Sequence, residues 1–95
     1  MATVTLEDLS TGKTLRLDPD RAKLFTRELA RVRSAKGGPP PPLLLAPALR
    51  ITVAAGAKKT IYELYARAVL ADAKTQRTWQ LYMGLLLHEW LDRAP

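Results

Sequence analysis

The stretch LYARAVLADAKTQRTWQLYMG, residues 64–84, reads as a long strand, a polar turn and a second strand. Alternate residues of a strand point to opposite faces of a sheet. One face of this stretch is apolar and consists of Leu64, Ala66, Ala68, Leu70, Trp79, Leu81 and Met83. The other is mixed and consists of Tyr65, Arg67, Val69, Thr78, Gln80 and Tyr82. We expect the apolar face to pack in the core, and the mixed face to be either a binding surface or the underside of another layer.

The turn in this stretch has a counterpart near the start of the chain. The segments DLSTGKT at 8–14 and DAKTQRT at 72–78 both read Asp-x-x-Thr, then Gly or Gln, then Lys or Arg, then Thr. A four-residue loop whose last residue is left-handed fits both segments. Gly12 suits that position, whereas Gln76 suits it less well. The flanking segments do not match, so we interpret the similarity as shared turn chemistry.

The shared turn predicts which residues face each other across the strands. Pairing Asp8 with Lys13, and Asp72 with Arg77, keeps the apolar side chains of each hairpin on one side. The predicted pairs are Leu6–Leu15, Val4–Leu17, Leu70–Trp79, Ala68–Leu81, Ala66–Met83, Val69–Gln80 and Arg67–Tyr82. Placing Ala55 opposite Thr60 in the intervening hairpin predicts Arg50–Tyr65 and Thr52–Glu63. The mixed face would then carry two neighbouring Arg–Tyr pairs.

Two amphipathic segments are predicted to be helices. The first follows the N-cap Asp18 and Pro19, and its apolar stripe is Ala22, Phe25, Leu29 and Val32, widened by Leu24, with Gly37 and Gly38 ending it. The second, GLLLHEWLDRAP, has the stripe Leu86, Leu87, Trp90 and Leu91, with Leu85, Glu89 and Asp92 off it. On this second helix His88 lies four residues before Asp92, a spacing at which the two side chains can meet.

These elements predict a single α+β domain over residues 1–95, in the order ββαβββα, with two helices packed on an antiparallel sheet. A hairpin and a helix fill residues 1–36, with strands at 3–8 and 13–17. The proline-rich segment 37–48 is expected to be a stiff extended connector. A three-stranded meander and the closing helix fill 49–95, with strands at 49–55, 60–71 and 77–83.

The composition and motifs of the chain limit the classes of function that we expect. The chain has no cysteine and one histidine, and it has no apolar run near the ~18 residues that span a membrane. The segment MATVTLEDLS does not resemble a secretion signal, so we expect a cytoplasmic protein without cofactor or metal. No nucleophile–base pair, P-loop or GxGxxG segment is present, so an enzyme is not expected. Fifteen basic against nine acidic residues give a net charge of +6, which favours polyanionic partners.

Two groups of residues are therefore candidates for binding single-stranded DNA or RNA. The mixed sheet face supplies aromatic rings for stacking on bases and basic groups for phosphates, namely Arg50, Tyr65, Arg67, Gln80 and Tyr82. Basic positions outside this face are the line Lys23, Arg27 and Arg31 at helical spacing and the hairpin tip Lys58 and Lys59. The alternative is a homo-oligomeric, for example dimeric, protein-interaction module without a nucleic-acid role, whose mixed face or closing helix is buried against another chain.

Overall fold

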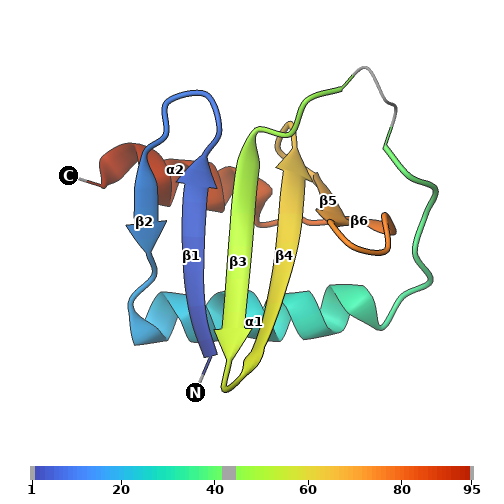
Figure 1. Ribbon diagram of the computed structural model, residues 1–95, viewed down its shortest axis with the longest axis horizontal. Helices are drawn as coiled ribbons and strands as arrows, with labels where there is room; N and C mark the ends of the chain where they lie inside the picture. Colours follow the sequence, from blue (N-terminus) through green and yellow to red (C-terminus); the bar gives the residue numbers. More distant parts are fainter. Residues whose placement is uncertain (1, 42–44, 95) are drawn as a thin grey trace.

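The computed structural model describes residues 2–41 and 45–94, which form a six-stranded antiparallel sheet and two helices (Figure 1). The elements are β1 (Ala2–Asp8), β2 (Thr14–Arg16), α1 (Pro19–Arg33), β3 (Leu49–Ala55), β4 (Lys58–Tyr65), β5 (Val69–Asp72), β6 (Thr78–Gln80) and α2 (Gly84–Arg93). The strands lie side by side in the order β2-β1-β3-β4-β5-β6. The predicted α+β class, with two helices and an antiparallel sheet, is confirmed.

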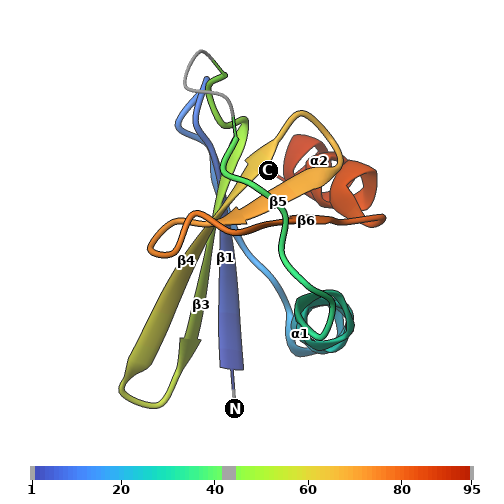
Figure 2. The same cartoon turned by 90° about the vertical axis from the view of Figure 1, so that its right-hand side faces the viewer.

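Both helices lie on the same side of the sheet (Figure 2). Strands β5 and β6 bend toward that side, and β6 passes between α1 and α2. The core fills the space between sheet and helices and contains, among others, Val4, Leu6, Phe25, Leu29, Ile51, Tyr62, Leu64, Leu70, Trp79, Leu81, Leu87 and Leu91. Neither helix covers the opposite face of the sheet, which we call the open face.

The first hairpin and the first helix form as predicted. Leu6 pairs with Leu15, and the backbone N–H of Leu17 donates to the carbonyl of Val4 at 2.9 Å. In α1 the predicted stripe is buried, and the carboxylate of Asp18 accepts from the backbone N–H of Arg21. Leu24 does not widen the stripe. Its side chain is 48% exposed, so that prediction is wrong.

The two related turns have the same conformation. Gly12 and Gln76 both have a positive φ, of 78° and 64°. Each backbone N–H donates to the carbonyl of the aspartate that opens its loop, at 2.8 Å. The aspartate side chains, Asp8 and Asp72, each accept from the backbone N–H groups of the residues two and three positions later. Hydrogen bonds from Ser10 lower the pKa of the Asp8 carboxyl. The shared turn chemistry is thereby confirmed.

The predicted long strand 60–71 is wrong, because the chain reverses within it. Residues 66–68 form a tight turn in which Ala66 has a φ of 54°, and Tyr65 then pairs with Val69. Three turn residues return the chain with Leu64 opposite Leu70, so the apolar residues on either side still share one face. The alternating pattern therefore continues through the turn without a break, which is why the sequence reads as one strand.

The predicted register of the β3–β4 hairpin is also wrong, by two residues. The loop contains only Gly56 and Ala57, so Ala55 pairs with Lys58 instead of Thr60. Gly56 has a φ of 61°, which suits a two-residue hairpin loop. The true pairs Arg50–Glu63 and Thr52–Ile61 replace Arg50–Tyr65 and Thr52–Glu63.

The end of the chain packs closely on the β4–β5 turn. Strand β6 is shorter than the predicted 77–83, although its pairs Leu70–Trp79 and Val69–Gln80 are as predicted. The backbone N–H of Leu81 donates to the carbonyl of Ala68 at 2.6 Å, after which the chain enters α2. The Nε2 atom of His88 lies 2.9 Å from the carbonyl oxygen of Ala66, and among the described residues no ion pair joins His88 to Asp92.

The connector lies along the outer edge of the sheet. Helix α1 ends at Arg33, before the predicted glycines. The backbone N–H of Gly38 then donates to the carbonyl of Thr78 at 2.8 Å, and the Thr78 hydroxyl donates to the carbonyl of Pro39 at 2.7 Å. Residues 42–44 of the predicted connector lie outside the described residues. Within the described part of the chain, neither helix is long and apolar enough to cross a membrane.

Candidate functional site

The mixed face predicted from the sequence is only partly assembled. Tyr65, Val69 and Gln80 are cross-strand partners and form one row on the open face. Arg67 lies in the β4–β5 turn, and Tyr82 follows β6 with 73% of its surface exposed and its ring 6.0 Å from the Arg31 guanidinium. The predicted Arg67–Tyr82 pair is therefore wrong, because β6 ends at Gln80.

Arg50 does lie on the open face, but acidic residues surround it. Its cross-strand neighbours are Glu7 on one side and Glu63 on the other. The Arg50 Nη1 atom is 3.4 Å from the Glu7 carboxylate. The Glu7 and Glu63 carboxylates offset part of the positive field of this arginine, which weakens it as a phosphate contact.

The basic line on α1 is exposed but lies far from the open face. Lys23, Arg27 and Arg31 are all exposed on the outer side of the helix, and the helix covers the opposite side of the sheet (Figure 2). Arg31 forms an ion pair with Glu28, and this hydrogen bond lowers the pKa of the Glu28 carboxyl. One ligand strand therefore cannot contact the line and the open face without passing around the edge of the domain.

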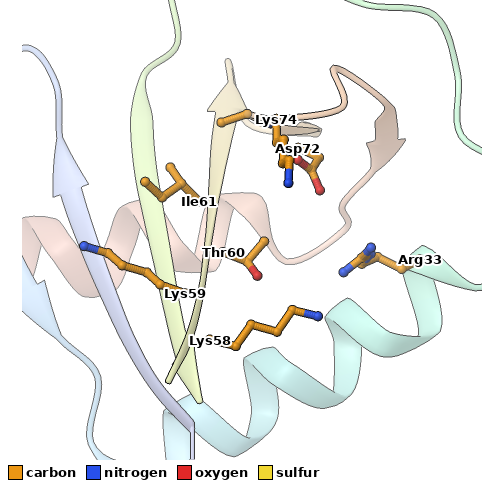
Figure 3. A pocket seen from close by; sticks show the side chains of 8 residues that line it. Arg33, Lys58, Lys59, Thr60, Ile61, Asp72 and Lys74 are labelled. Carbon is orange, nitrogen blue, oxygen red and sulfur yellow. Dashed lines mark hydrogen bonds between the residues drawn. The ribbon is translucent and has the colours of Figure 1, made fainter. Parts of the chain in front are cut away.

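Basic residues meet instead around a cleft of about 500 Å³ between the end of α1, the start of β4 and the β5–β6 turn (Figure 3). Its lining residues are Arg33, Lys58, Lys59, Thr60, Ile61, Asp72, Ala73 and Lys74. Arg33 and Lys58 point toward one another across it, whereas Lys59 points away (Figure 3). A second hollow of about 280 Å³ between α1 and the β3–β4 hairpin shares Arg33, Lys58 and Thr60.

The cleft exists because β4 is longer than its neighbour β5. The pairing of β4 with β5 begins at Tyr62 opposite Asp72, with one further hydrogen bond from Ala73 N–H to the Ile61 carbonyl at 3.0 Å. Backbone groups two residues apart point to the same side of a strand. The backbone of Lys59 therefore faces the cleft, and within the described residues no strand lies beside it there.

Arg33 is held in place from one side only. Its Nη1 atom donates to the Tyr62 hydroxyl at 2.8 Å, and its guanidinium lies 5.9 Å from the centres of both the Tyr62 and Trp79 rings. Tyr62 is 1% exposed, and the indole N–H of Trp79 donates to the Ala35 carbonyl at 3.2 Å, so both rings are fixed. Burial raises the pKa of the Tyr62 hydroxyl.

The cations of the cleft are not neutralised by the protein. Asp72, the one acid among the lining residues, is 5% exposed and accepts from the backbone N–H groups of Lys74 and Thr75 at 2.8 and 3.1 Å. Across the described residues, no carboxylate lies within 4.0 Å of a nitrogen of Arg33, Lys58 or Lys74. Such uncompensated cations attract anions more strongly than paired ones.

Sequence reasoning identified the hairpin lysines but missed Arg33, Thr60 and Lys74 as partners. Lys74 lies in the recognised turn motif and Arg33 at the end of the recognised helix. These residues lie together because β4 extends beyond β5. The apolar alternation runs through the turn between these strands, so their lengths cannot be read from the sequence. In the described residues, no three His, Asp or Glu side chains gather closely enough to hold a metal ion.

Comparisons with protein-family models, with curated proteins and with solved structures find no match to this chain.

Proposed function

We propose that this protein is a small binding module for single-stranded nucleic acid, and that it holds the phosphates of its ligand in the basic cleft. The observation that carries the proposal is the group of uncompensated cations, Arg33, Lys58 and Lys74, around one concave site. Phosphate contacts supply most of the affinity in sequence-independent binding of nucleic acids. Binding through the open face is less well supported, since Arg50 is paired with Glu7 and Tyr82 lies beyond the end of β6.

The test measures binding of a fluorescent single-stranded oligonucleotide by anisotropy over a range of salt concentrations. We expect the affinity to fall as salt rises, with a slope of log K against log salt of about −0.7 for each phosphate neutralised. The double variant Lys58→Gln/Lys74→Gln should weaken binding and reduce the magnitude of the slope by about 1.4. The proposal is disproved if the unmodified protein does not bind the oligonucleotide at low salt, or if its affinity does not change with salt.

A matched control separates the cleft from general attraction by a positive protein. The variant Lys23→Gln/Arg27→Gln removes the same charge from the exposed side of α1. It should retain the affinity and slope of the unmodified protein more closely than the cleft variant does. If both variants lose the same affinity, binding follows the net charge and the cleft has no special role.

A second function is favoured by a separate observation. On the open face, Ile61 and Val69 are 37% and 39% exposed, and both helices lie on the other side of the sheet (Figure 2). A second copy of the chain packing on this face would bury them, as expected for a homo-oligomeric interaction module. Light scattering after size-exclusion chromatography tests this function, because Ile61→Lys should dissociate such an oligomer. A monomer at high concentration contradicts it.

A further inference from the structure

We infer that the cleft recognises a phosphomonoester, namely the terminal phosphate of a nucleic-acid strand, in preference to an internal phosphodiester. This inference rests on the proposed function and specifies the part of the ligand that the cleft binds. The relevant features are the geometry of Arg33, the other donors around it and the net charge of the site.

Arg33 offers its guanidinium to the cleft while the Tyr62 hydroxyl and the Tyr62 and Trp79 rings restrict its movement from one side. A guanidinium has five N–H donors, and the Tyr62 hydroxyl is the acceptor for one of its nitrogens. Within the described part of the chain, no carboxylate lies close enough to pair with the remaining donors. Two parallel N–H groups of an arginine match two oxygens of one phosphate, and prior immobilisation reduces the entropy lost on binding.

Other donors lie around the same space. Lys58 points toward Arg33 from the opposite wall, and Thr60 lies two residues further along β4 on the Lys58 side (Figure 3). The unpaired backbone of Lys59 adds an N–H group, because β5 ends its pairing with β4 before that residue. This arrangement surrounds a ligand on several sides. A terminal phosphate presents three free oxygens, whereas an internal phosphodiester presents two.

The net charge of the site also suits a monoester. The charged lining residues Arg33, Lys58, Lys59, Lys74 and Asp72 carry a net charge of +3, or +2 without Lys59, whose side chain points away from the cleft. A phosphomonoester carries about −1.5 to −2 at neutral pH, with a second pKa near 6. An internal phosphodiester carries −1. The monoester therefore neutralises the site more completely.

The experiment compares three oligonucleotides of one sequence, with a 5′ phosphate, with a 3′ phosphate and with hydroxyl groups at both ends. Each is labelled at an end without phosphate, and binding is measured by anisotropy at pH 7.5. We expect one phosphorylated strand to bind at least tenfold more tightly than the unmodified strand, and the arm that does so identifies the end recognised. The preference should shrink toward pH 5.5, because the phosphate becomes a monoanion below its second pKa.

The variant Arg33→Lys keeps the charge but loses the guanidinium, so it should reduce the preference while salt-dependent binding persists. Arg27→Lys on the exposed side of the same helix is the control and should keep the preference. Equal affinity for all three strands, or an unchanged preference in Arg33→Lys, overturns the inference and leaves the proposed function standing. Failure of every strand to bind overturns both.

Discussion

Replacement of Gly84 by alanine should destabilise this protein far more than a usual glycine-to-alanine change. A Cβ atom at this position would lie 1.9 Å from the carbonyl oxygen of Arg67 and 2.7 Å from its carbonyl carbon. Ordinary contacts begin at 3.4 Å, so the first residue of α2 and the β4–β5 turn must separate by roughly 1.5 Å. Both groups belong to backbone, and neither can rotate away as a side chain would.

The cost follows from what this separation breaks. Forced overpacking costs about 1–3 kcal/mol. Movement of the turn also strains two hydrogen bonds, worth about 1 kcal/mol each. One runs from the Leu81 N–H to the Ala68 carbonyl, and the other joins His88 to the Ala66 carbonyl. We expect a total loss of about 3–5 kcal/mol, against a stability of about 5–15 kcal/mol for most domains.

Urea unfolding followed by tryptophan fluorescence and circular dichroism measures this loss, since Trp79 is largely buried in the core. The control is Gly56→Ala in the β3–β4 loop, where φ is 61° and no atom lies within 4 Å of the added Cβ. That variant should lose only about 1 kcal/mol, from the unfavourable left-handed backbone. If Gly84→Ala is no less stable than Gly56→Ala, the close approach of α2 to the turn is wrong.

Three further predictions concern the turns and the buried tyrosine. Gln76→Gly should raise the free energy of unfolding by about 0.5 kcal/mol in urea titrations, because its φ of 64° suits glycine, and a lower value would contradict the strain argument. Asp72→Ala should cost about 2–3 kcal/mol, and more than Asp8→Ala in the exposed related turn, so equal losses in the same titrations would refute the role of burial. Burial raises the pKa of Tyr62 above its unfolded value near 10, so its contribution to stability is complete below that pH and declines as pH rises through the folded pKa. Melting temperatures measured from pH 8 to 12 should therefore fall less steeply in Tyr62→Phe than in the unmodified protein, and parallel curves would contradict this assignment.

Local features of this fold could be predicted where the residues of a short segment determine its backbone conformation. The N-cap Asp18, the stripe of α1 and the paired turns at Gly12 and Gln76 all depend on neighbours within a few positions. The turn at residues 66–68 could not be predicted, because it contains neither glycine nor proline and leaves the apolar alternation intact. The β3–β4 loop is two residues shorter than predicted, so the cross-strand partner of Arg50 is Glu63 and not Tyr65. A shift by two residues keeps the same side chains on each face, so the buried residues are unchanged.

The site depended on contacts that are distant in the sequence. Arg33 ends one helix, Lys58 begins a strand after the connector, and Lys74 lies in a later turn. Their proximity results from the bend of β5 and β6 toward α1 and from the unpaired start of β4. Neither the bend nor the unpaired start of β4 produces a periodic pattern in the sequence. The hairpin lysines could therefore be predicted as site residues, whereas Arg33 and Lys74 could not.

The hydrogen bond between the connector and β6 also affects how copies of this protein can meet. A free sheet edge invites another chain to add a strand, which leads to aggregation. Here the connector occupies that edge through Gly38, and the prolines that follow, Pro39 to Pro41, have no N–H group to offer a further strand. The opposite edge, β2, has only three residues. Growth of the sheet from molecule to molecule is thereby hindered at the β6 edge by the connector and at the β2 edge by the shortness of that strand.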